Sequence, residues 1–383
     1  LAFVAGMSIL TACSSDDNND NDGNGGNGNG NEIENGTILK GTITSDVTLA
    51  AGNTYKLSGE YIVEEGATLH IEEGVKIIAV YDDIADYILV KQGGKINAVG
   101  TPDKPIVMTS EKEEPGAWGG IHICGRAHTN AEGGKGSSEI GGAVYGGNDD
   151  ADNSGTLQYI RLEYTGFAFD EEHEANGISF YGVGNGTIVD HCQAYKGSDD
   201  GFEFFGGSVN VSNLVAVSCS DDSFDWTEGW NGKGTNLVAY QEDKSTLGYD
   251  CDCLMECDNN GSNNAATPVA HPVLKNLILV GNGGSKQGIR LRAGTEVEID
   301  NAKVCGKGQP LTVETALTEN ALKNGTSKLT NITLTSELSS KEGIYTHADF
   351  IAVTSNKVDA NLSYSSFEDI RKECSWMNGS WVK

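Results

Sequence analysis

Short apolar runs alternate with small and polar residues along most of the chain, and between residues 176 and 305 this alternation repeats. Five segments share the order apolar, polar, apolar after a first residue that is small in all but Leu254; they are residues 177–180, 201–204, 223–226, 254–257 and 288–291. A second apolar run follows each of them and carries one polar residue at a matching place: His191, Asn213, Asn236, Asn276 and Asn301. The steps along this second series are 22, 23, 40 and 25 residues. A unit of 20-odd residues with two short strands predicts the coils of a parallel β-solenoid.

The rest of the chain supports the same all-β class. Glycine is abundant (51) and proline scarce (6), and the short runs are rich in Val, Ile and aromatic residues. We predict that residues 37–383 form one solenoid, in which residues 37–59 are an N-terminal cap. At the other end Trp376 and Trp381 should close a last partial coil as a hydrophobic plug, the alternative being a platform for sugars.

The first 36 residues predict an address outside the cytoplasm. Residues 1–10 are apolar, as in the h-region of a secretory signal, and Leu10-Thr11-Ala12-Cys13 resembles a bacterial lipobox, so residues 1–13 should end in a lipidated Cys13. Residues 14–36 should be a disordered acidic tether, since residues 14–31 contain no apolar side chain. The acidic residues directly after Cys13 resemble the surface-export signal of Bacteroidetes lipoproteins, with a plain spacer as the alternative.

Four segments resemble the right-handed parallel β-helix lipoproteins of Bacteroidetes: residues 100–107 (GTPDKPIV), 116–123 (GAWGGIHI), 145–155 (YGGNDDADNSG) and 199–207 (DDGFEFFGG). The resemblance runs from about residue 59 to the C-terminus. It implies a right-handed parallel β-helix on the outer surface of the outer membrane. That family has no settled reaction, so it supplies no catalytic residues. The cysteine-rich residues 250–257 depart from its pattern, where relatives tend to have a glycine-containing turn.

The negative net charge of the chain excludes some classes of binding partner. The formal charge is −29, which repels nucleic acid and anionic lipid headgroups. It suits divalent cations or neutral glycans, although solubility alone would also explain it. The sequence lacks a nucleophile elbow, a Walker glycine loop, a zinc-protease motif and a dinucleotide fingerprint.

One row of polar residues is the candidate binding site. Because side chains alternate across a strand, Ser179, Glu203, Asp225, Glu256 and Arg290 should point outward from neighbouring coils, about 4.8 Å apart. Stacked carboxylates repel unless they are protonated, paired or bound to a cation, and Arg290 offers partial pairing. Such a row suits a Ca²⁺ site or acid–base work on a bound sugar, with a solvated acidic face as the plain alternative. The six aspartates that deepen its negative field are Asp199, Asp200, Asp221, Asp222, Asp250 and Asp252.

Aromatic, calcium-loop and cysteine signals complete the candidate chemistry. Trp226 should point inward, and Trp230 on the loop after it is the candidate to stack on a sugar. Asp150, Asp152 and Ser154 have the spacing of half a calcium loop, but the glutamate expected at the twelfth place is absent, so an ordinary turn is the alternative. Besides Cys13 there are eight cysteines, and aligning the coils puts Cys219 beside Cys251 as a candidate disulfide.

The asparagine series is best explained structurally. Stacked Asn side chains can hydrogen-bond from coil to coil, with His191 at the head of the row. Leu214, Leu237 and Leu277, each directly after a ladder asparagine, should then be buried.

The sequence therefore favours a lipid-anchored surface β-helix that binds carbohydrate, with Ca²⁺ as the candidate ion. One alternative is a polysaccharide lyase or glycoside hydrolase that uses Glu203, Asp225 and Glu256. Another is a structural or adhesive surface protein.

Overall fold

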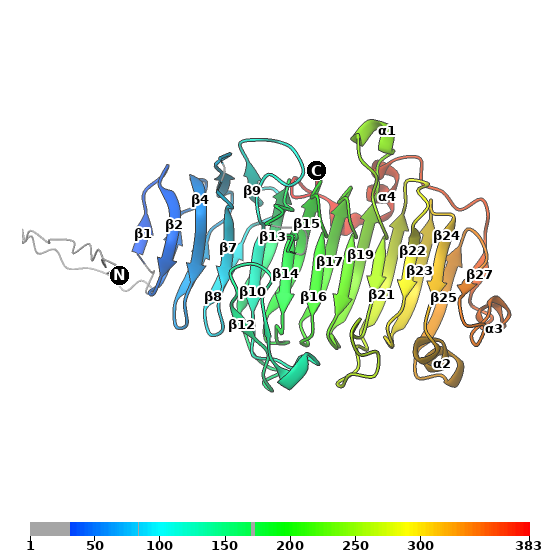
Figure 1. Ribbon diagram of the computed structural model, residues 1–383. Coiled ribbons are helices and arrows are strands. Elements are labelled where there is room, and N and C mark those ends of the chain that lie inside the picture. The colour runs from blue at the N-terminus through cyan, green and yellow to red at the C-terminus, as the bar shows by residue number, and fades with distance from the viewer. Residues whose placement is uncertain (1–30, 83, 170–172) are drawn as a thin grey trace, which may run out of the picture.

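The computed structural model describes residues 31–82, 84–169 and 173–383, and these wind into one elongated parallel β-helix (Figure 1). The predicted all-β solenoid is confirmed, since nearly every strand pairs in parallel with the strand one coil further along. The predicted signal segment, Cys13 and residues 14–30 of the predicted tether lie outside the described residues. No helix of the described residues is long and apolar enough to cross a membrane.

Three parallel sheets form the sides of the solenoid. Sheet 1 contains the candidate site; its strands are β7 (Tyr87–Val90), β10 (Ile121–Cys124), β14 (Ile178–Tyr181), β16 (Phe202–Phe205), β18 (Phe224–Thr227), β20 (Met255–Cys257), β22 (Gln287–Leu291), β24 (Gln309–Val313) and β26 (Ser339–Ser340). Sheet 2 begins with β1 (Asn31–Ile33), β3 (Val47–Leu49), β5 (Thr68–Ile71) and β8 (Lys95–Val99). Sheet 3 begins with β2 (Ile38–Ile43), β4 (Thr54–Val63), β6 (Lys76–Ala79) and β9 (Ile106–Ser110); the far halves of β2 and β4 start sheet 1.

From the fifth coil onward, sheets 2 and 3 share strands that bend in the middle. These strands are β13 (Gly155–Glu163), β15 (Ile188–Tyr195), β17 (Asn210–Val217), β19 (Lys233–Tyr240), β21 (Val273–Val280), β23 (Glu298–Cys305) and β25 (Lys328–Leu334), followed by the short β27 (Lys357–Val358). The residue at the bend has positive φ in each of the seven long strands, between 52° and 63°. Asn adopts this left-handed conformation at lower cost than most side chains, which explains why it recurs there.

The asparagine ladder is confirmed at these bends. Each amide Nδ2 donates to the Oδ1 one coil earlier: Asn236 to Asn213 at 2.8 Å, Asn276 to Asn236 at 3.0 Å, and Asn301 to Asn276 at 2.8 Å. His191 has the bend conformation but is no rung, because Asn213 donates to Asp190 Oδ1 at 2.6 Å instead. The imidazole of His191 stacks on the ring of Tyr159, with 4.4 Å between centroids.

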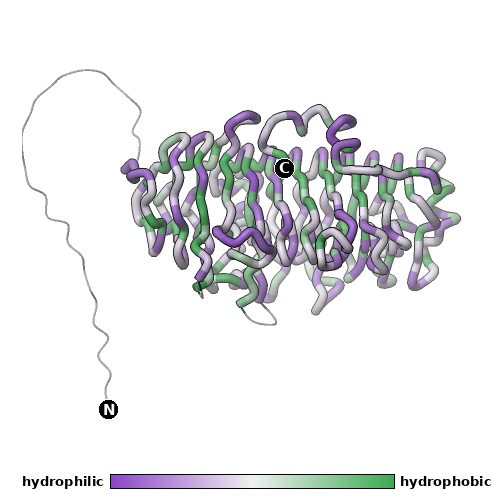
Figure 2. The backbone as a smooth tube through the Cα atoms, turned by 90° about the horizontal axis from the view of Figure 1, so that it is seen from above, coloured by the Kyte–Doolittle hydropathy of each residue, from purple (hydrophilic) through white to green (hydrophobic). Residues whose placement is uncertain are grey.

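A single apolar core fills the solenoid. The inward residues of sheet 1 stack on one another, as Phe180 does on Phe204 at 5.0 Å and Phe202 on Phe224 at 5.6 Å between ring centroids. The three leucines that follow ladder asparagines, Leu214, Leu237 and Leu277, are buried as predicted. Figure 2 shows hydrophobic segments recurring from coil to coil, with hydrophilic residues gathered in turns and loops.

The last residues of the predicted tether are part of the solenoid. Asn31–Ile33 form β1, which pairs in parallel with β3, so the last residues of the predicted 14–36 tether belong to the solenoid. Residues 37–59, predicted as a cap, form β2, β3 and the start of β4 in register with the coils that follow. Ile33, Ile43 and Val47 pack against the core at this end.

The C-terminal segment runs along the side of the solenoid, so the predicted end plug is wrong. Residues 362–383, which we call the strap, contain α4 (Phe367–Glu373) and the short 3-10 helix η2 (Ser375–Met377), and they turn back toward the N-terminal half (Figure 1). Strap side chains such as Ile370, Met377 and Trp381 cover outward apolar residues of sheet 3. The backbone N–H of Ser380 donates to Pro102 O at 2.8 Å, far from the last coil. Trp381 is fully buried and Trp376 only partly.

The remaining elements are short decorations. The cover loop, residues 125–154, carries the 3-10 helix η1 (Glu132–Gly134) and the hairpin of β11 (Gly136–Ser137) and β12 (Val144–Tyr145). The helices are α1 (Lys244–Leu247), α2 (Ala316–Asn324) and α3 (His347–Ala352). All eight described cysteines are buried and free, so the predicted disulfide between Cys219 and Cys251 is wrong.

Shortening Leu237 should test the coil register. We expect Leu237→Ala to lower the free energy of unfolding by about 2–5 kcal/mol, because the lost methyl groups leave a cavity between two coils. Leu317→Ala, on a half-exposed leucine of α2, is the control and should change stability by less than about 0.5 kcal/mol. Equal effects of the two substitutions in urea unfolding would contradict the register.

Candidate functional site

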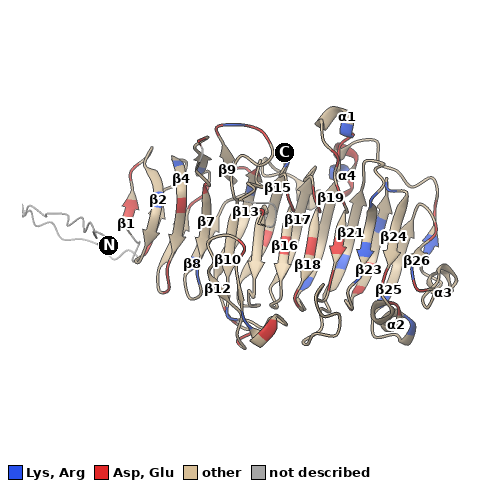
Figure 3. Cartoon of the chain, viewed as in Figure 1, with Lys and Arg blue, Asp and Glu red and all other residues tan. Residues whose placement is uncertain are grey.

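The predicted row of polar residues is present on the outer face of sheet 1. The parallel register pairs Ser179 with Glu203, Glu203 with Asp225, Asp225 with Glu256, and Glu256 with Arg290. The predicted register of the five side chains is therefore confirmed, but Ser179 and Glu256 are buried and do not face solvent as predicted. In Figure 3 red bands near β16 and β18 give way to blue bands toward β24.

The row is less exposed than an open face would be. Ser179 is fully buried, Glu256 is 8% exposed, and Glu203, Asp225 and Arg290 are partly buried. The amide of Asn176, just before β14, donates to Glu203 Oε2 at 2.6 Å and to Ser179 Oγ at 3.0 Å. Burial of charged groups without full pairing costs free energy, so the ionised form of this row destabilises the native state.

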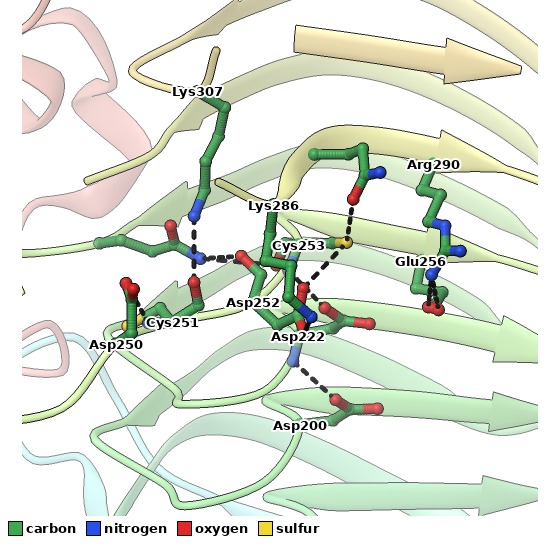
Figure 4. A network of polar contacts seen from close by, with 12 residues as sticks. Asp200, Asp222, Asp250, Cys251, Asp252, Cys253, Glu256, Lys286, Arg290 and Lys307 are labelled. Carbon is green, nitrogen blue, oxygen red and sulfur yellow. Dashed lines mark hydrogen bonds and ion pairs between the residues drawn. The ribbon is translucent and has the colours of Figure 1, made fainter. Parts of the chain in front are cut away.

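A second row runs beside the first at the entry of the same strands. The side chain of each member accepts the backbone N–H of the equivalent residue in the next coil: Asn176 from Asp200 at 3.2 Å, Asp200 from Asp222 at 2.8 Å, and Asp222 from Cys253 at 2.6 Å. Figure 4 shows the last two of these bonds. Asp200 and Asp222 are each about 95% buried. Each carboxylate thus has one oxygen held by backbone while the other is left near its neighbours.

The two rows bring metal-ligand atoms close together. Oxygens of Asp200, Glu203 and Asp225 all lie within 4.8 Å of one another. Two further groups meet the same limit, namely Asp199 with Asp200 and Asp221, and Asp222 with Asp252 and Cys253. The first group combines oxygens from both rows, and oxygen ligands are those that Ca²⁺ prefers.

We call Asp200, Glu203 and Asp225 the acidic half of the site. Their negative charge is not balanced by positive charge around them. Burial, and then the neighbouring carboxylates, raise the pKa values of Asp200, Glu203 and Asp225 well above their usual range. Asp225 Oδ1 is buried and has no hydrogen-bond partner among the described residues. None of the ion pairs within the described residues includes these three carboxylates. A proton or a cation is needed to stabilise them.

The next coils supply the missing positive charge for the other half. Arg290 Nη1 lies 3.2 Å from Glu256 Oε1, and Arg292 Nη2 lies 2.8 Å from the same oxygen. Arg292 Nε also pairs with Asp258 Oδ1 at 2.7 Å, and Arg290 Nε with Glu314 Oε1 at 3.3 Å. Burial raises the pKa of Glu256, and the two guanidiniums oppose that shift. The row is therefore uncompensated at Glu203 and Asp225 and paired at Glu256.

The cover loop closes the N-terminal end of the row. Tyr181 on β14 donates to Glu139 Oε2 at 3.1 Å, and Tyr145 on β12 donates to Glu228 Oε2 at 2.7 Å. Burial raises the pKa of Glu139 to about 7. Glu139 also raises the pKa of Glu203, so the loop adds a carboxyl group to the acidic half.

His122 continues the row beneath this loop. It pairs in register with Ser179, is fully buried, and burial lowers its pKa to about 4, so it is neutral. Its Nε2 lies 2.7 Å from Gly119 O. It therefore brings no positive charge to the neighbouring carboxylates.

Trp230 is not a sugar platform. It is 1% exposed, its Nε1 donates to Val209 O at 3.2 Å, and its ring stacks on Phe204 with 4.1 Å between centroids. The chain turns back into the core after β18, which alternation along the strand cannot reveal. Trp226 points inward as predicted and donates to Thr295 Oγ1 at 3.0 Å.

Asp150, Asp152 and Ser154 do not converge on one point. Asp150 Oδ1 lies 2.6 Å from His128 Nδ1 and accepts the backbone N–H of His128, while Asp152 Oδ2 accepts the backbone N–H of Arg126 at 2.9 Å. Ser154 is buried, and its N–H donates to Thr187 Oγ1. The two carboxylates thus fasten the end of the cover loop to its beginning, as in an ordinary turn.

Several site residues escaped the sequence analysis. Glu139 and Glu228 reach the acidic half from a loop and a turn, and no spacing links them to the repeat. Asn176, Asp258 and Arg292 could have been found, because each lies two or three residues from a row member in the repeat alignment.

Comparison with known proteins identifies a family for nearly the whole chain. A family model described as a pectate-lyase-like β-helix domain matches residues 41–382. No curated protein and no solved structure matches the chain.

The raised carboxyl pKa values predict that stability falls as the pH rises. Burial and neighbouring carboxylates raise the pKa of Asp199 to about 7, and that of Glu139 is also about 7, whereas carboxyls of an unfolded chain titrate near 4. At these two groups the native state binds more protons than the unfolded chain, so their contribution to stability is fully present below about pH 4 and is lost as the pH rises through about 7. We expect the free energy of unfolding in EDTA to drop by at least about 1 kcal/mol between pH 5 and 8.

Two substitutions test the origin of this pH dependence. Asp199→Asn should flatten the curve between pH 5 and 8, because the amide cannot ionise. Asp300→Asn is the control, since the pKa of Asp300 is lowered by Asn331 and Thr330 and this group titrates below that window. An Asp199→Asn curve as steep as that of the native chain would show that Asp199 does not cause the pH dependence.

Proposed function

Because the chain belongs to the family of pectate-lyase-like β-helix domains, we propose that the outer face of sheet 1 binds a polysaccharide through a divalent cation. The cation is Ca²⁺ or an ion of similar preference, held by Asp200, Glu203 and Asp225. One observation carries the proposal: three partly or fully buried carboxylates with oxygens within 4.8 Å of one another belong to no ion pair of the described residues.

A cation would reduce the repulsion between these carboxylates more than protons alone. Ca²⁺ takes six to eight oxygen ligands at about 2.3–2.6 Å, and three carboxylates that each offer one oxygen supply fewer than that number. The remaining positions are open to water or to oxygens of a ligand. Sugar hydroxyl and carboxylate oxygens are suitable ligands, so the same ion that stabilises the face would also hold the glycan.

The length of the row favours a polymer over a small ligand. Its members occupy consecutive coils about 4.8 Å apart, from Glu203 to Arg290. A chain lying along the row would meet the cation at Glu203 and Asp225 and the guanidiniums at Arg290 and Arg292. Because both guanidiniums are already paired with carboxylates of the chain, the cation is the element that would attract carboxylates, and it makes an acidic polysaccharide the preferred class.

Polysaccharide cleavage is the second candidate. Burial and neighbouring carboxylates raise the pKa values of Glu203 and Asp225 well above the usual range, so in the absence of a cation a proton held there could be donated to a leaving oxygen. A lyase also needs a base, and Arg290 and Arg292 are poor bases because their pKa values are raised further by their carboxylate partners. Binding therefore explains the arrangement with fewer requirements.

The cellular location is part of the same proposal. A lipidated Cys13 and the polar residues after it would place the solenoid outside the cell, where it could meet polysaccharides. A surface protein with a purely structural role is the remaining alternative.

Calcium should stabilise the protein through Asp225. We expect millimolar Ca²⁺ to raise the melting temperature by a few degrees, since an ion at 100 times its dissociation constant adds about 2.7 kcal/mol. Asp225→Asn should remove most of that increase, and Asp300→Asn on another face should leave it intact. Differential scanning calorimetry with EDTA as the baseline measures the effect.

The same variants separate binding from cleavage. Polygalacturonate and alginate should bind in Ca²⁺ and be released by EDTA, with weaker binding to Asp225→Asn. Release of reducing ends or of unsaturated products that Asp225→Asn abolishes would favour the enzyme instead. No thermal response to Ca²⁺ together with no polysaccharide binding would reduce the row to a solvated acidic surface.

The anchor can be tested in cells. Cys13→Ser should release the protein from the membrane fraction, because the lipid can no longer be attached. Ser14→Ala, next to the same position, is the control and should remain in that fraction. Cys13→Ser protein that still fractionates with membranes would rule out the lipobox.

A further inference from the structure

A small cavity lies where the strap meets the asparagine ladder, away from sheet 1. It has a volume of about 260 Å³, and its walls include Asn236, Asn276, Asn301, Lys303, Glu373 and Trp376. The asparagines come from the bends of β19, β21 and β23. Lys303 also lies on β23, whereas Glu373 and Trp376 come from the strap. We call it the ladder cavity.

The ladder amides have hydrogen-bonding capacity left over. An amide has two N–H donors and an oxygen with two lone pairs. Asn276 uses one donor toward Asn236 and one lone pair toward Asn301. Asn301 ends the series, because Asn331 in the next coil donates to Asp300 Oδ1 at 2.6 Å and not to Asn301. Asn276 and Asn301 are both exposed, so the spare donors and acceptors face the cavity side of the ladder.

Trp376 gives the cavity an aromatic wall. The strap holds this indole against Trp381, with 6.2 Å between ring centroids, and against the edge of His191 at 6.4 Å. It stays partly exposed, whereas Trp118, Trp226, Trp230 and Trp381 are at most 1% exposed. An aromatic face beside a few fixed polar groups is the usual composition of a small-molecule site.

The charges around the cavity favour an uncharged ligand. Lys303 Nζ and Glu373 Oε1 form an ion pair at its rim, and Tyr364 donates to the other oxygen of Glu373 at 2.8 Å. The two charges cancel, in contrast to the uncompensated carboxylates of sheet 1. The site therefore offers amides and an aromatic face without net attraction for an ion.

We propose that the ladder cavity binds one uncharged sugar residue of a glycan chain. The apolar face of the sugar ring lies against the Trp376 indole, and its hydroxyls exchange hydrogen bonds with the amides of Asn276 and Asn301. The volume is suited to a single ring, so neighbouring residues of the glycan extend outside it. This site is independent of the acidic row and needs no cation.

Trp376 is a built-in reporter for the test. We would titrate the full-length protein, ¹⁵N-labelled at tryptophan, with cellohexaose, xylohexaose and mannohexaose in EDTA and follow the five indole signals by NMR. At least one of these neutral hexasaccharides should shift the Trp376 signal in a saturable way and leave the four buried indoles in place. Trp376→Ala should weaken that binding, measured by calorimetry, by about tenfold or more, the effect of losing one good contact.

Because Trp376→Ala could disturb the folding of the strap, a second pair of variants tests the cavity from the ladder side. Asn276→Gly keeps the left-handed backbone, whose φ is 60°, and removes one amide of the cavity, so it should weaken binding by about fivefold or more. Asn213→Gly is the matched control; it removes a ladder amide with φ of 56° that does not line the cavity, and its affinity should be that of the native chain.

The results of these experiments can be distinguished from those that test the acidic row of sheet 1. No shift of the Trp376 signal with any of the three neutral sugars would overturn the proposal. Equal losses from Asn276→Gly and Asn213→Gly would also overturn it, since they would reflect ladder integrity. Hexagalacturonate binding is the test of sheet 1, since Asp225→Asn should abolish it and Trp376→Ala should leave it unchanged, so failure of one proposal can be told from failure of the other.

Discussion

The structure depends on the parallel pairing of each coil with the next in a fixed register. Once Ser179, Glu203 and Asp225 are paired through their backbones, their side chains lie in one row whatever their charges. Backbone hydrogen bonds and the stacked core impose this order, because a slip by one residue would turn Phe202 and Phe204 outward and Glu203 into the core. The rows on the surface are therefore a consequence of the core.

The same geometry has opposite energetic results for different side chains. Asparagines in a row satisfy one another, and the ladder from Asn213 to Asn301 stabilises the bends between sheets 2 and 3. Carboxylates in a row repel, and burial strengthens the repulsion at Glu203 and Asp225. Further along the row, Arg290 and Arg292 relieve the repulsion at Glu256. Unbalanced negative charge is thus confined to one part of sheet 1, where a cation or a proton can neutralise it. This pattern supports a binding role there.

Two segments outside the repeat decide which surfaces remain accessible. The cover loop folds over the N-terminal part of sheet 1 and brings Glu139 to the acidic half. The strap buries the apolar outer face of sheet 3 and brings Trp376 to the ladder. Each segment covers apolar surface and, at its margin, adds a functional group to a row that the coils had already built. Both proposed sites lie at such margins.

The sequence alone determined the solenoid, the row from Ser179 to Arg290, the asparagine ladder and the burial of Leu214, Leu237 and Leu277. These features follow from a local period, which the chain repeats from coil to coil. Only the tertiary structure decided the fate of residues outside that period. Trp230 turns into the core, Asp150 and Asp152 bind backbone N–H groups of the cover loop, Cys219 and Cys251 stay apart as thiols, and the strap runs along sheet 3. The physical reason is that a repeat fixes its own neighbours through backbone pairing, whereas loops and termini find theirs through long-range packing that no spacing in the chain encodes.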